Sequence, residues 1–419
     1  MVIHNAFADV GNIPIPTTAD KVLTILLIPF AVCSLLKFGK LAASLALTFG
    51  GYALISLIGA LCASNPGVPQ PLSAVCDIIR DAELPVIFLG FLYFCDKDID
   101  PRRTLQLVSW FYILFAMINS PFIIRDYFGG GIGFYGQQLL FRLGLPVPQG
   151  FFDQKAESAW ACFVAATCAA YLYSVRPTVY RAMLVIALSI LVLIHLSAKE
   201  SAALLIIGLV YQFRKASLSP ATVFAAVVAC VIVITVVFVS PIGDLFTLQF
   251  DSYVTEAQGA AVRTELTKTG FEIANRYFPL GSGGGTFASP QSYQFGYSQL
   301  YIDYNINNLW GASPEEPTFL VDVFWPKIIA QSGWIGFILF LGFLWVIFSR
   351  SLLLFYRDKS AEGWICFSIA FGILIFSIAM NPYTSEFLEI ANGFFASYAF
   401  SSFERGPVFR RGIAVPTEF

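Results

Sequence analysis

Charged residues are scarce in this chain, and so is histidine. Asp, Glu, Lys and Arg together make up 12% of the 419 residues, whereas hydrophobic residues make up 57%. A water-soluble globule with so little polar surface would not stay dissolved, and the mean hydropathy of +0.72 indicates a polytopic membrane protein. The only histidines are His4 and His195, which argues against a His-ligated metal centre. We expect no metal and no other cofactor.

The long polar segment 241–325 contains no cysteine, so we expect no disulfide framework to hold it together. All cysteines lie in or beside apolar runs, and no Cys/His spacing indicates a metal site. They are Cys33, Cys62, Cys76, Cys95, Cys162, Cys168, Cys230 and Cys366. Residues 1–20 lack the basic start and apolar centre of a secretory signal, so we expect no cleavable signal peptide.

Apolar runs that approach the length of a membrane span recur along the chain. A helix needs about 20 residues to cross about 30 Å of hydrocarbon. Eleven such runs lie at 22–37, 41–63, 73–95, 104–124, 158–174, 182–198, 200–213, 220–240, 326–349, 363–380 and 386–403. Several are short, so the range is ten to twelve. We predict an all-α fold with residues 1–419 as one membrane domain and about eleven transmembrane helices.

Basic residues occur in every second connection between these predicted spans. They are Lys37 and Lys40; Lys97, Arg102 and Arg103; Arg176 and Arg181; Arg214 and Lys215; Arg350, Arg357 and Lys359; and Arg405, Arg410 and Arg411. Because cytoplasmic loops carry an excess of Lys and Arg, we predict a cytoplasmic C-terminus and an N-terminus outside. Segments 125–157 and 241–325 are then outer loops, and the second is too long to be a mere connector.

The long outer loop contains a helical pattern followed by a glycine run. In "AAVRTELTKTGFEIANRYF" apolar residues recur at helical spacing, which predicts an amphipathic helix that ends at Pro279. The glycines of "PLGSGGGTF", 279–287, allow positive φ and close backbone approach, and successive N–H groups there could form an anion-binding nest. A plain helix stop and turn is the alternative, and the sequence leaves both open.

Aromatic residues are concentrated after the glycines. Residues 277–325 contain Tyr277, Phe278, Phe287, Tyr293, Phe295, Tyr297, Tyr301, Tyr304, Trp310, Phe319, Phe324 and Trp325. Flat rings beside amide side chains suit a sugar, but an interfacial belt or the core of a small cap would have the same composition. Segment 241–325 carries three basic residues against nine acidic ones, so we expect no nucleic-acid partner. Phosphate would need individually placed arginines, whose planar fork matches phosphate oxygens.

The third predicted span opens with four charged residues, Asp77, Arg80, Asp81 and Glu83. Charge is costly in a bilayer, so these side chains should pair with one another or face a cavity. Asp77 with Arg80 or Asp81, and Arg80 with Glu83, are within helical reach. A structural pair within this helix is favoured over a proton relay.

Several short motifs, in their order and spacing, resemble the O-antigen ligase and Wzy-type polysaccharide polymerase superfamily of bacterial inner-membrane glycosyltransferases. They are Arg263 at the head of a loop helix, "PLGSGGGTF", "GWIG" at 333–336, "RLGLPVPQGFFDQKAESAW" at 142–160, and "SAKESAALL" at 197–205. The ligases carry His-[Asn/Ser/Gln]-x9-Gly-x-x-Gly, and counting back from Gly333 places Asp322 at the His position. The resemblance covers about residues 125–350.

The resemblance implies a GT-C-like fold and metal-independent glycosyl transfer at the periplasmic face of the inner membrane. Donor and acceptor would be glycans on undecaprenyl diphosphate, and the product a polysaccharide such as an exopolysaccharide or O-antigen. A flippase and a chain-length co-polymerase would be its protein partners. The nearer alternative is a ligase that transfers glycan to lipid A core or to protein. The other alternative is a lipid-linked oligosaccharide flippase or transporter, but the polar residues are concentrated in one outer loop, which favours an enzyme.

Roles for individual residues follow from the same resemblance. Arg263 and Arg142 would stabilise the leaving diphosphate, with Arg276 and Lys199 in support. Asp322 would accept the proton of the acceptor hydroxyl, unless it only caps the next helix. The substitutes for Asp322 are Glu316, Glu315, Asp303 and His195. The other residues expected to bind substrate are Gly281, Gly283, Gly284, Gly285, Tyr277 and Trp325.

Overall fold

The computed structural model describes residues 19–63, 67–68, 71–133, 139, 141–142, 145–152, 155–195, 203–204, 208, 258–317, 319–321, 323–377 and 386–405. This part of the chain is almost entirely helical, which fits the predicted all-α class. Its one sheet is a short hairpin in which β1 (Phe141–Arg142) pairs antiparallel with β2 (Leu145–Pro146).

The helices follow the predicted spans over most of the chain. Up to residue 195 they are α2 (Ala19–Lys37), α3 (Gly39–Leu45), a π-helical turn (Ala46–Gly50), α4 (Gly51–Cys62), α5 (Leu72–Asp81), α6 (Glu83–Lys97), α7 (Pro101–Phe128), α8 (Lys155–Val175) and α9 (Val179–Ile194). From residue 258 they are α13 (Gln258–Arg276), α14 (Gln291–Gln294), α15 (Gln299–Asp303), the 3₁₀ turn η3 (Ile306–Asn308), α16 (Trp325–Asp358), α17 (Ala361–Phe376) and α18 (Glu386–Glu404).

Four helices in the described ranges are long and apolar enough to cross a bilayer, by length and composition. They are Gly39–Cys62, Pro101–Phe128, Lys155–Val175 and Trp325–Asp358. The predicted span 220–240 lies outside the described residues, and 200–213 is described only at 203, 204 and 208. The total of eleven spans therefore stays a prediction.

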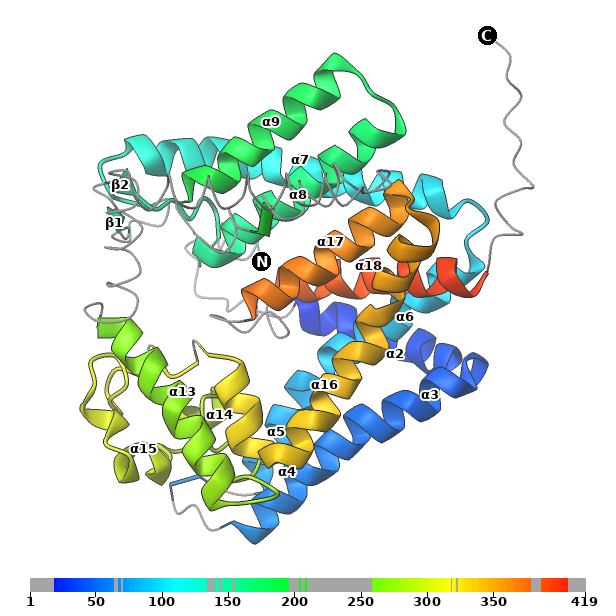
Figure 1. The fold of residues 1–419 in the computed structure, drawn as a ribbon. Coiled ribbons are helices and arrows are strands. Elements are labelled where there is room, and N and C mark those ends of the chain that lie inside the picture. The colour runs from blue at the N-terminus through cyan, green and yellow to red at the C-terminus, as the bar shows by residue number, and fades with distance from the viewer. Residues whose placement is uncertain are drawn as a thin grey trace, which may run out of the picture.

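Ion pairs and hydrogen bonds tie together one end of the helix bundle, and they use the basic residues of the alternating connections. Lys37 at the end of α2 pairs with Asp96 of α6, and Arg102 of α7 pairs with Glu362 of α17 at 3.0 Å. Arg405, which follows α18, donates to the carbonyl of Asp98 at 2.9 Å. The hairpin β1–β2 and helices α13–α15 lie at the opposite end of the helices (Figure 1). The basic connections and the two predicted outer loops are thus separated by the length of the bundle.

The main hydrophobic core lies between α6, α7, α8, α16, α17 and α18. Gly393 of α18 packs closely on Ile87 of α6, and the hydroxyl of Ser397 donates to the carbonyl of Phe88. The outer faces of the helices are also apolar, with Leu36 81% and Ile25 63% exposed. A face of this kind suits contact with lipid rather than with water.

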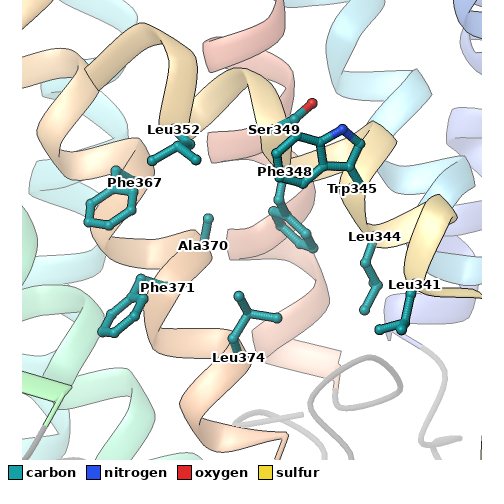
Figure 2. A pocket seen from close by; sticks show the side chains of 10 residues that line it. All are labelled: Leu341, Leu344, Trp345, Phe348, Ser349, Leu352, Phe367, Ala370, Phe371 and Leu374. Carbon is teal, nitrogen blue, oxygen red and sulfur yellow. The ribbon is translucent and has the colours of Figure 1, made fainter. Parts of the chain in front are cut away.

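Two apolar grooves lie within the bundle. The groove between α16 and α17 has a volume of about 210 Å³, and Trp345, Phe348 and Phe371 are among the residues that line it (Figure 2). A second groove of about 370 Å³ is lined by residues of α8 and α9 and by Trp364 of α17. Neither contains a charged side chain, so neither is a candidate for the chemistry considered below.

Candidate functional site

Residues 258–323 fold into a small unit with a hydrophobic core of its own, which we call the cap. Val262, Leu266 and Ile273 of α13 are fully buried, as the amphipathic pattern predicted. Phe287 and Tyr301 join them in this core. Part of the aromatic cluster therefore has a packing role, whereas Phe278, Phe295 and Trp310 are 69%, 41% and 52% exposed and remain available to a ligand.

The cap is anchored to the bundle by residues 279–287, which we call the glycine turn. Its successive N–H groups donate to acceptors on three different helices. Ser282 and Gly283 donate to the carbonyls of Ala330 and Gln331 of α16, both at 2.9 Å. Gly284 donates to the carbonyl of Ser56 of α4 at 3.1 Å, and Gly285 donates to Oδ2 of Asp77 of α5 at 3.3 Å. These N–H groups are bound by the protein, so they do not form an open nest for an anion.

Glycine is required in this turn because the backbone of the turn packs directly against the backbone of α16. A Cβ on Gly281 would lie 2.4 Å from the nitrogen of Gly333, and a Cβ on Gly333 would lie 2.3 Å from the carbonyl oxygen of Pro279. Both residues have positive φ, +76° and +60°, which side chains disfavour. Gly333 also interrupts the helical conformation of α16. The motifs "PLGSGGGTF" and "GWIG" thus pack directly on each other, although 46 positions separate Phe287 at the end of the first from Gly333 at the start of the second.

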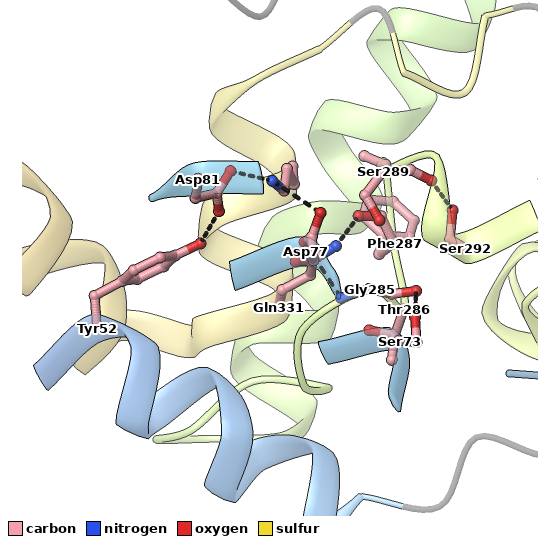
Figure 3. A network of polar contacts seen from close by, with 12 residues as sticks. Tyr52, Ser73, Asp77, Asp81, Gly285, Thr286, Phe287, Ser289, Ser292 and Gln331 are labelled. Atoms are coloured by element: carbon pink, nitrogen blue, oxygen red, sulfur yellow. Dashed lines mark hydrogen bonds and ion pairs between the residues drawn. The ribbon is translucent and has the colours of Figure 1, made fainter. Parts of the chain in front are cut away.

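Directly behind the glycine turn lies a buried ionic cluster, which we call the lysine cluster: Lys327, Asp77, Asp81 and Tyr52 (Figure 3). Lys327 of α16 lies 2.7 Å from Oδ1 of Asp81 and 3.2 Å from Oδ1 of Asp77. The hydroxyl of Tyr52 of α4 donates to Oδ2 of Asp81 at 2.7 Å. All four side chains are at most 5% exposed.

The lysine cluster corrects the predicted pairing of the charges in the third span. Asp77 and Asp81 pair with Lys327, 246 positions beyond Asp81, rather than with Arg80 in their own helix. Glu83 pairs with Lys21 of α2 at 2.6 Å. The sequence did contain a signal for this arrangement, because Lys327 lies at the start of a long apolar run where a lone charge needs a partner.

The two arginines of α13 lie at opposite ends of that helix. They are 13 residues apart, which corresponds to about 20 Å along the axis. Arg263 is half-buried, with its guanidinium 6.0 Å from the centre of the Phe319 ring. Arg276 is exposed, and a hydrogen bond to Tyr304 raises its pKa. The two side chains are too far apart to hold one diphosphate together.

The remaining predicted site residues are only partly covered by the structure. Asp322 and Lys199 lie outside the described residues, and Arg142 belongs to β1. Glu316 is exposed, and its N–H donates to the hydroxyl of Ser313 at 3.1 Å. Trp325 begins α16 and donates through Nε1 to the hydroxyl of Ser377 at 3.0 Å. Tyr277 is partly buried against the cap core, where its carbonyl accepts from Gly281 at 2.9 Å.

His195 takes part in a separate buried polar contact beside the outer segment 125–157. Nε2 of His195 lies 2.9 Å from the hydroxyl of Ser158, and Nδ1 lies 2.7 Å from the carbonyl of Leu191. Asn119 of α7 donates to the same Ser158 hydroxyl at 2.9 Å and accepts from the N–H of Phe151 at 3.0 Å. His195 is 1% exposed, so in this state it ties α8 to α9 and is closed to an acceptor sugar.

Comparisons with known protein families and with curated proteins found no match. Within the described ranges, no group of three His, Cys, Asp or Glu side chains is arranged to hold a metal ion.

Proposed function

We propose that this protein polymerises oligosaccharide repeat units carried on undecaprenyl diphosphate, at the outer face of the bacterial inner membrane. One observation supports the proposal most directly. The described part of the long loop, from residue 258 on, folds into a cap that is fixed on the ends of α4, α5 and α16 by a buried glycine turn, and it carries arginines and exposed aromatic rings. A cap of this kind can hold a sugar chain while the lipid that carries it stays beside the helices.

The proposed reaction is a single glycosyl transfer. The bond between the anomeric carbon of the donor glycan and its diphosphate oxygen breaks, and the diphosphate leaves with the bonding electrons. A hydroxyl of the acceptor glycan forms the new glycosidic bond, and its proton passes to a carboxylate. Arg263 is the arginine that would bind the leaving diphosphate from the cap, since charge-assisted hydrogen bonds strengthen as charge develops on the oxygens.

Asp322 is the proposed proton acceptor, and the position of Phe319 supports this choice. Phe319 lies three residues before Asp322 in sequence and its ring faces the Arg263 guanidinium at 6.0 Å. Arg263 therefore lies close to Phe319, three positions before the candidate base, which itself lies outside the described residues. One site on the cap would then hold both the group that binds the leaving diphosphate and the group that removes the acceptor proton.

The test is a reconstituted reaction with purified protein, an undecaprenyl-diphosphate-linked repeat and EDTA, with products resolved on a gel. We expect a ladder of repeats with wild type and none with Arg263→Ala or Asp322→Ala. Lys268→Ala is the matched control, because Lys268 lies on the same helix, is exposed, and pairs with Glu265 at 3.7 Å. Transfer of a single glycan to a lipid A core acceptor would support the ligase instead. Movement of the lipid across vesicles without any product would support a transporter.

A further inference from the structure

Arg80 is a half-buried arginine of α5 that no described residue binds by a hydrogen bond or an ion pair. Its acidic neighbours already have other partners. Asp77 and Asp81 face Lys327 at 3.2 and 2.7 Å, and Glu83 faces Lys21 at 2.6 Å. A guanidinium has five N–H donors in a fixed fork, and that fork matches the oxygens of a phosphate. Arg80 is therefore the arginine of the cap junction best placed to bind a ligand.

The level of Arg80 relative to the bilayer follows from α2. The two ends of that helix are marked by ion pairs, Lys21 with Glu83 at 2.6 Å and Lys37 with Asp96. The lysines are 16 residues apart, which corresponds to about 24 Å of helix and is close to the thickness of the hydrocarbon layer. Arg80 lies one helical turn before Glu83, on the side of the cap. Its side chain is thus at the level where lipid phosphate groups lie.

The surroundings of Arg80 combine a lipid-facing side and a cap-facing side. On α5 the side chains of Leu72, Val75 and Ile79 are 54%, 40% and 62% exposed, whereas Asp77 on the opposite side of the helix is buried. Successive residues of an α-helix are rotated by about 100°, so Arg80 lies between the exposed side chains and the buried side that carries Asp77. Helix α14 of the cap packs on α5, and the charge of Arg80 partly offsets the rise that burial causes in the pKa of Tyr293. A lipid tail along the exposed side chains of α5 would bring its head group to Arg80, on the side of the cap that carries Tyr293.

Arg80 also changes the net charge of the polar group formed with the lysine cluster. Two ionised carboxylates at Asp77 and Asp81 would carry two negative charges, against the one positive charge of Lys327. Without Arg80 the lysine cluster would carry a net negative charge and would repel a phosphate next to it. With the positive charge of Arg80 added, the lysine cluster and Arg80 together are neutral. The guanidinium fork of Arg80 can then bind two phosphate oxygens at once.

We propose that Arg80 binds the diphosphate of a polyprenyl lipid at the seam between α5 and the cap, and so holds the lipid-linked donor in place. The identity of the lipid rests on the proposed function, whereas the phosphate chemistry rests on the position of Arg80.

A binding experiment tests this without any reaction. Purified full-length protein is placed in nanodiscs of neutral phosphatidylcholine, and binding of labelled polyprenyl diphosphate is measured for wild type, Arg80→Gln, Arg80→Lys and Lys268→Gln. We expect Arg80→Gln to weaken binding by about tenfold or more, since a charge-assisted bond is lost and the local charge becomes negative. Arg80→Lys should retain part of the affinity because it keeps the charge without the fork. Lys268→Gln should bind as wild type does.

Competition separates a membrane lipid from a soluble ion. Polyprenyl diphosphate should compete with the label, whereas phosphatidylglycerol or inorganic diphosphate at the same concentration should compete weakly. Equal competition by either would overturn the assignment to the carrier lipid. Wild-type affinity in Arg80→Gln, or no binding by wild type, would overturn the role of Arg80.

A second measurement uses the unmodified chain and so does not depend on a variant that folds. A photoreactive group placed next to the diphosphate should label residues 72–80, and labelling confined to other segments would contradict the proposal. The outcome is independent of the polymerisation assay. Binding that requires Arg80 in a protein that forms no polymer would leave this inference standing and remove the proposed function. Polymer formation and binding that are both unchanged in Arg80→Gln would remove this inference and leave the proposed function standing.

Discussion

Replacing Lys327 by methionine should destabilise the protein more than replacing either of its two acidic partners. Methionine fills a similar volume but leaves Asp77 and Asp81 buried without the cation that compensates them. Removing one side of a buried ion pair typically costs about 3–5 kcal/mol. The free energy of unfolding should therefore fall by about that amount in Lys327→Met.

The two acidic partners should differ from each other, and the distances decide the order. Asp81 has two short contacts, with Lys327 and Tyr52, each at 2.7 Å. Asp77 has longer ones, 3.2 Å to Lys327 and 3.3 Å to the N–H of Gly285. Hydrogen bonds to charged groups contribute about 1.5–3 kcal/mol, so Asp81→Asn should cost about that much. Asp77→Asn should cost about 1 kcal/mol or less, because it leaves one ammonium beside one carboxylate.

Equilibrium unfolding in detergent, followed by tryptophan fluorescence and by protease cleavage within 241–325, measures both the global and the local effect. The triple variant Asp77→Asn, Asp81→Asn, Lys327→Met removes every charge and should recover much of the stability lost in Lys327→Met. A cost for Asp77→Asn equal to that of Lys327→Met would refute this account of the cluster. Failure of the triple variant to recover would refute it equally.

Two further variants test the cap. Gly283→Ala should release the glycine turn and expose the cap to protease, because a Cβ there would lie 2.4 Å from Cα of Ala60 and φ of this residue is +91°. The control is Gly50→Ala, in which no atom lies within 4 Å of the new Cβ. This control should resist protease as wild type does. Equal resistance of the two glycine variants would contradict the packing described. Tyr301→Phe should lower the stability of the cap by about 1–3 kcal/mol, since the Tyr301 hydroxyl accepts from the N–H of Ala288 at 2.8 Å and shares a hydrogen bond with Ser292 at 2.6 Å. The control is Tyr356→Phe, a side chain that is 78% exposed, and hydrogen exchange at Ala288 that stays as slow as in wild type would exclude the effect.

Hydrophobic pattern predicted the helices well, because the apolar runs and the amphipathic repeat of α13 are local features. Val262, Leu266 and Ile273 occupy the buried face that their spacing indicates. The same local reasoning was wrong about the charges of α5. Pairing rules within one helix favour neighbours, but the partner of Asp81 came from α16, and the lone charge of Lys327 indicates that a partner is needed without identifying it.

The glycine run shows a different limit of the sequence. Its composition allowed either an anion nest or a plain turn, and both share the same backbone freedom. The choice between them depends on what the N–H groups of Ser282 to Gly285 face, and they face carbonyls of α4 and α16 and a carboxylate of α5. Only the three-dimensional arrangement supplies those acceptors. The signal that was present but unused is the shared glycine content of 281–285 and 333, since close backbone contacts need glycine on both sides.

The contacts of the glycine turn with α16 also constrain the order in which the protein can be assembled. The acceptors of Ser282 and Gly283 are Ala330 and Gln331, and the cation behind Gly285 is Lys327. All three are synthesised after the turn, by some 40 to 50 residues, which corresponds to a few seconds at about 5–20 residues per second. During that interval the turn has its acceptors on α4 and α5 but lacks those on α16, and Asp77 and Asp81 lack the ammonium of Lys327. Insertion of α16 is therefore the step that completes the anchoring of the cap and brings the cation of Lys327 to the two aspartates at the same time.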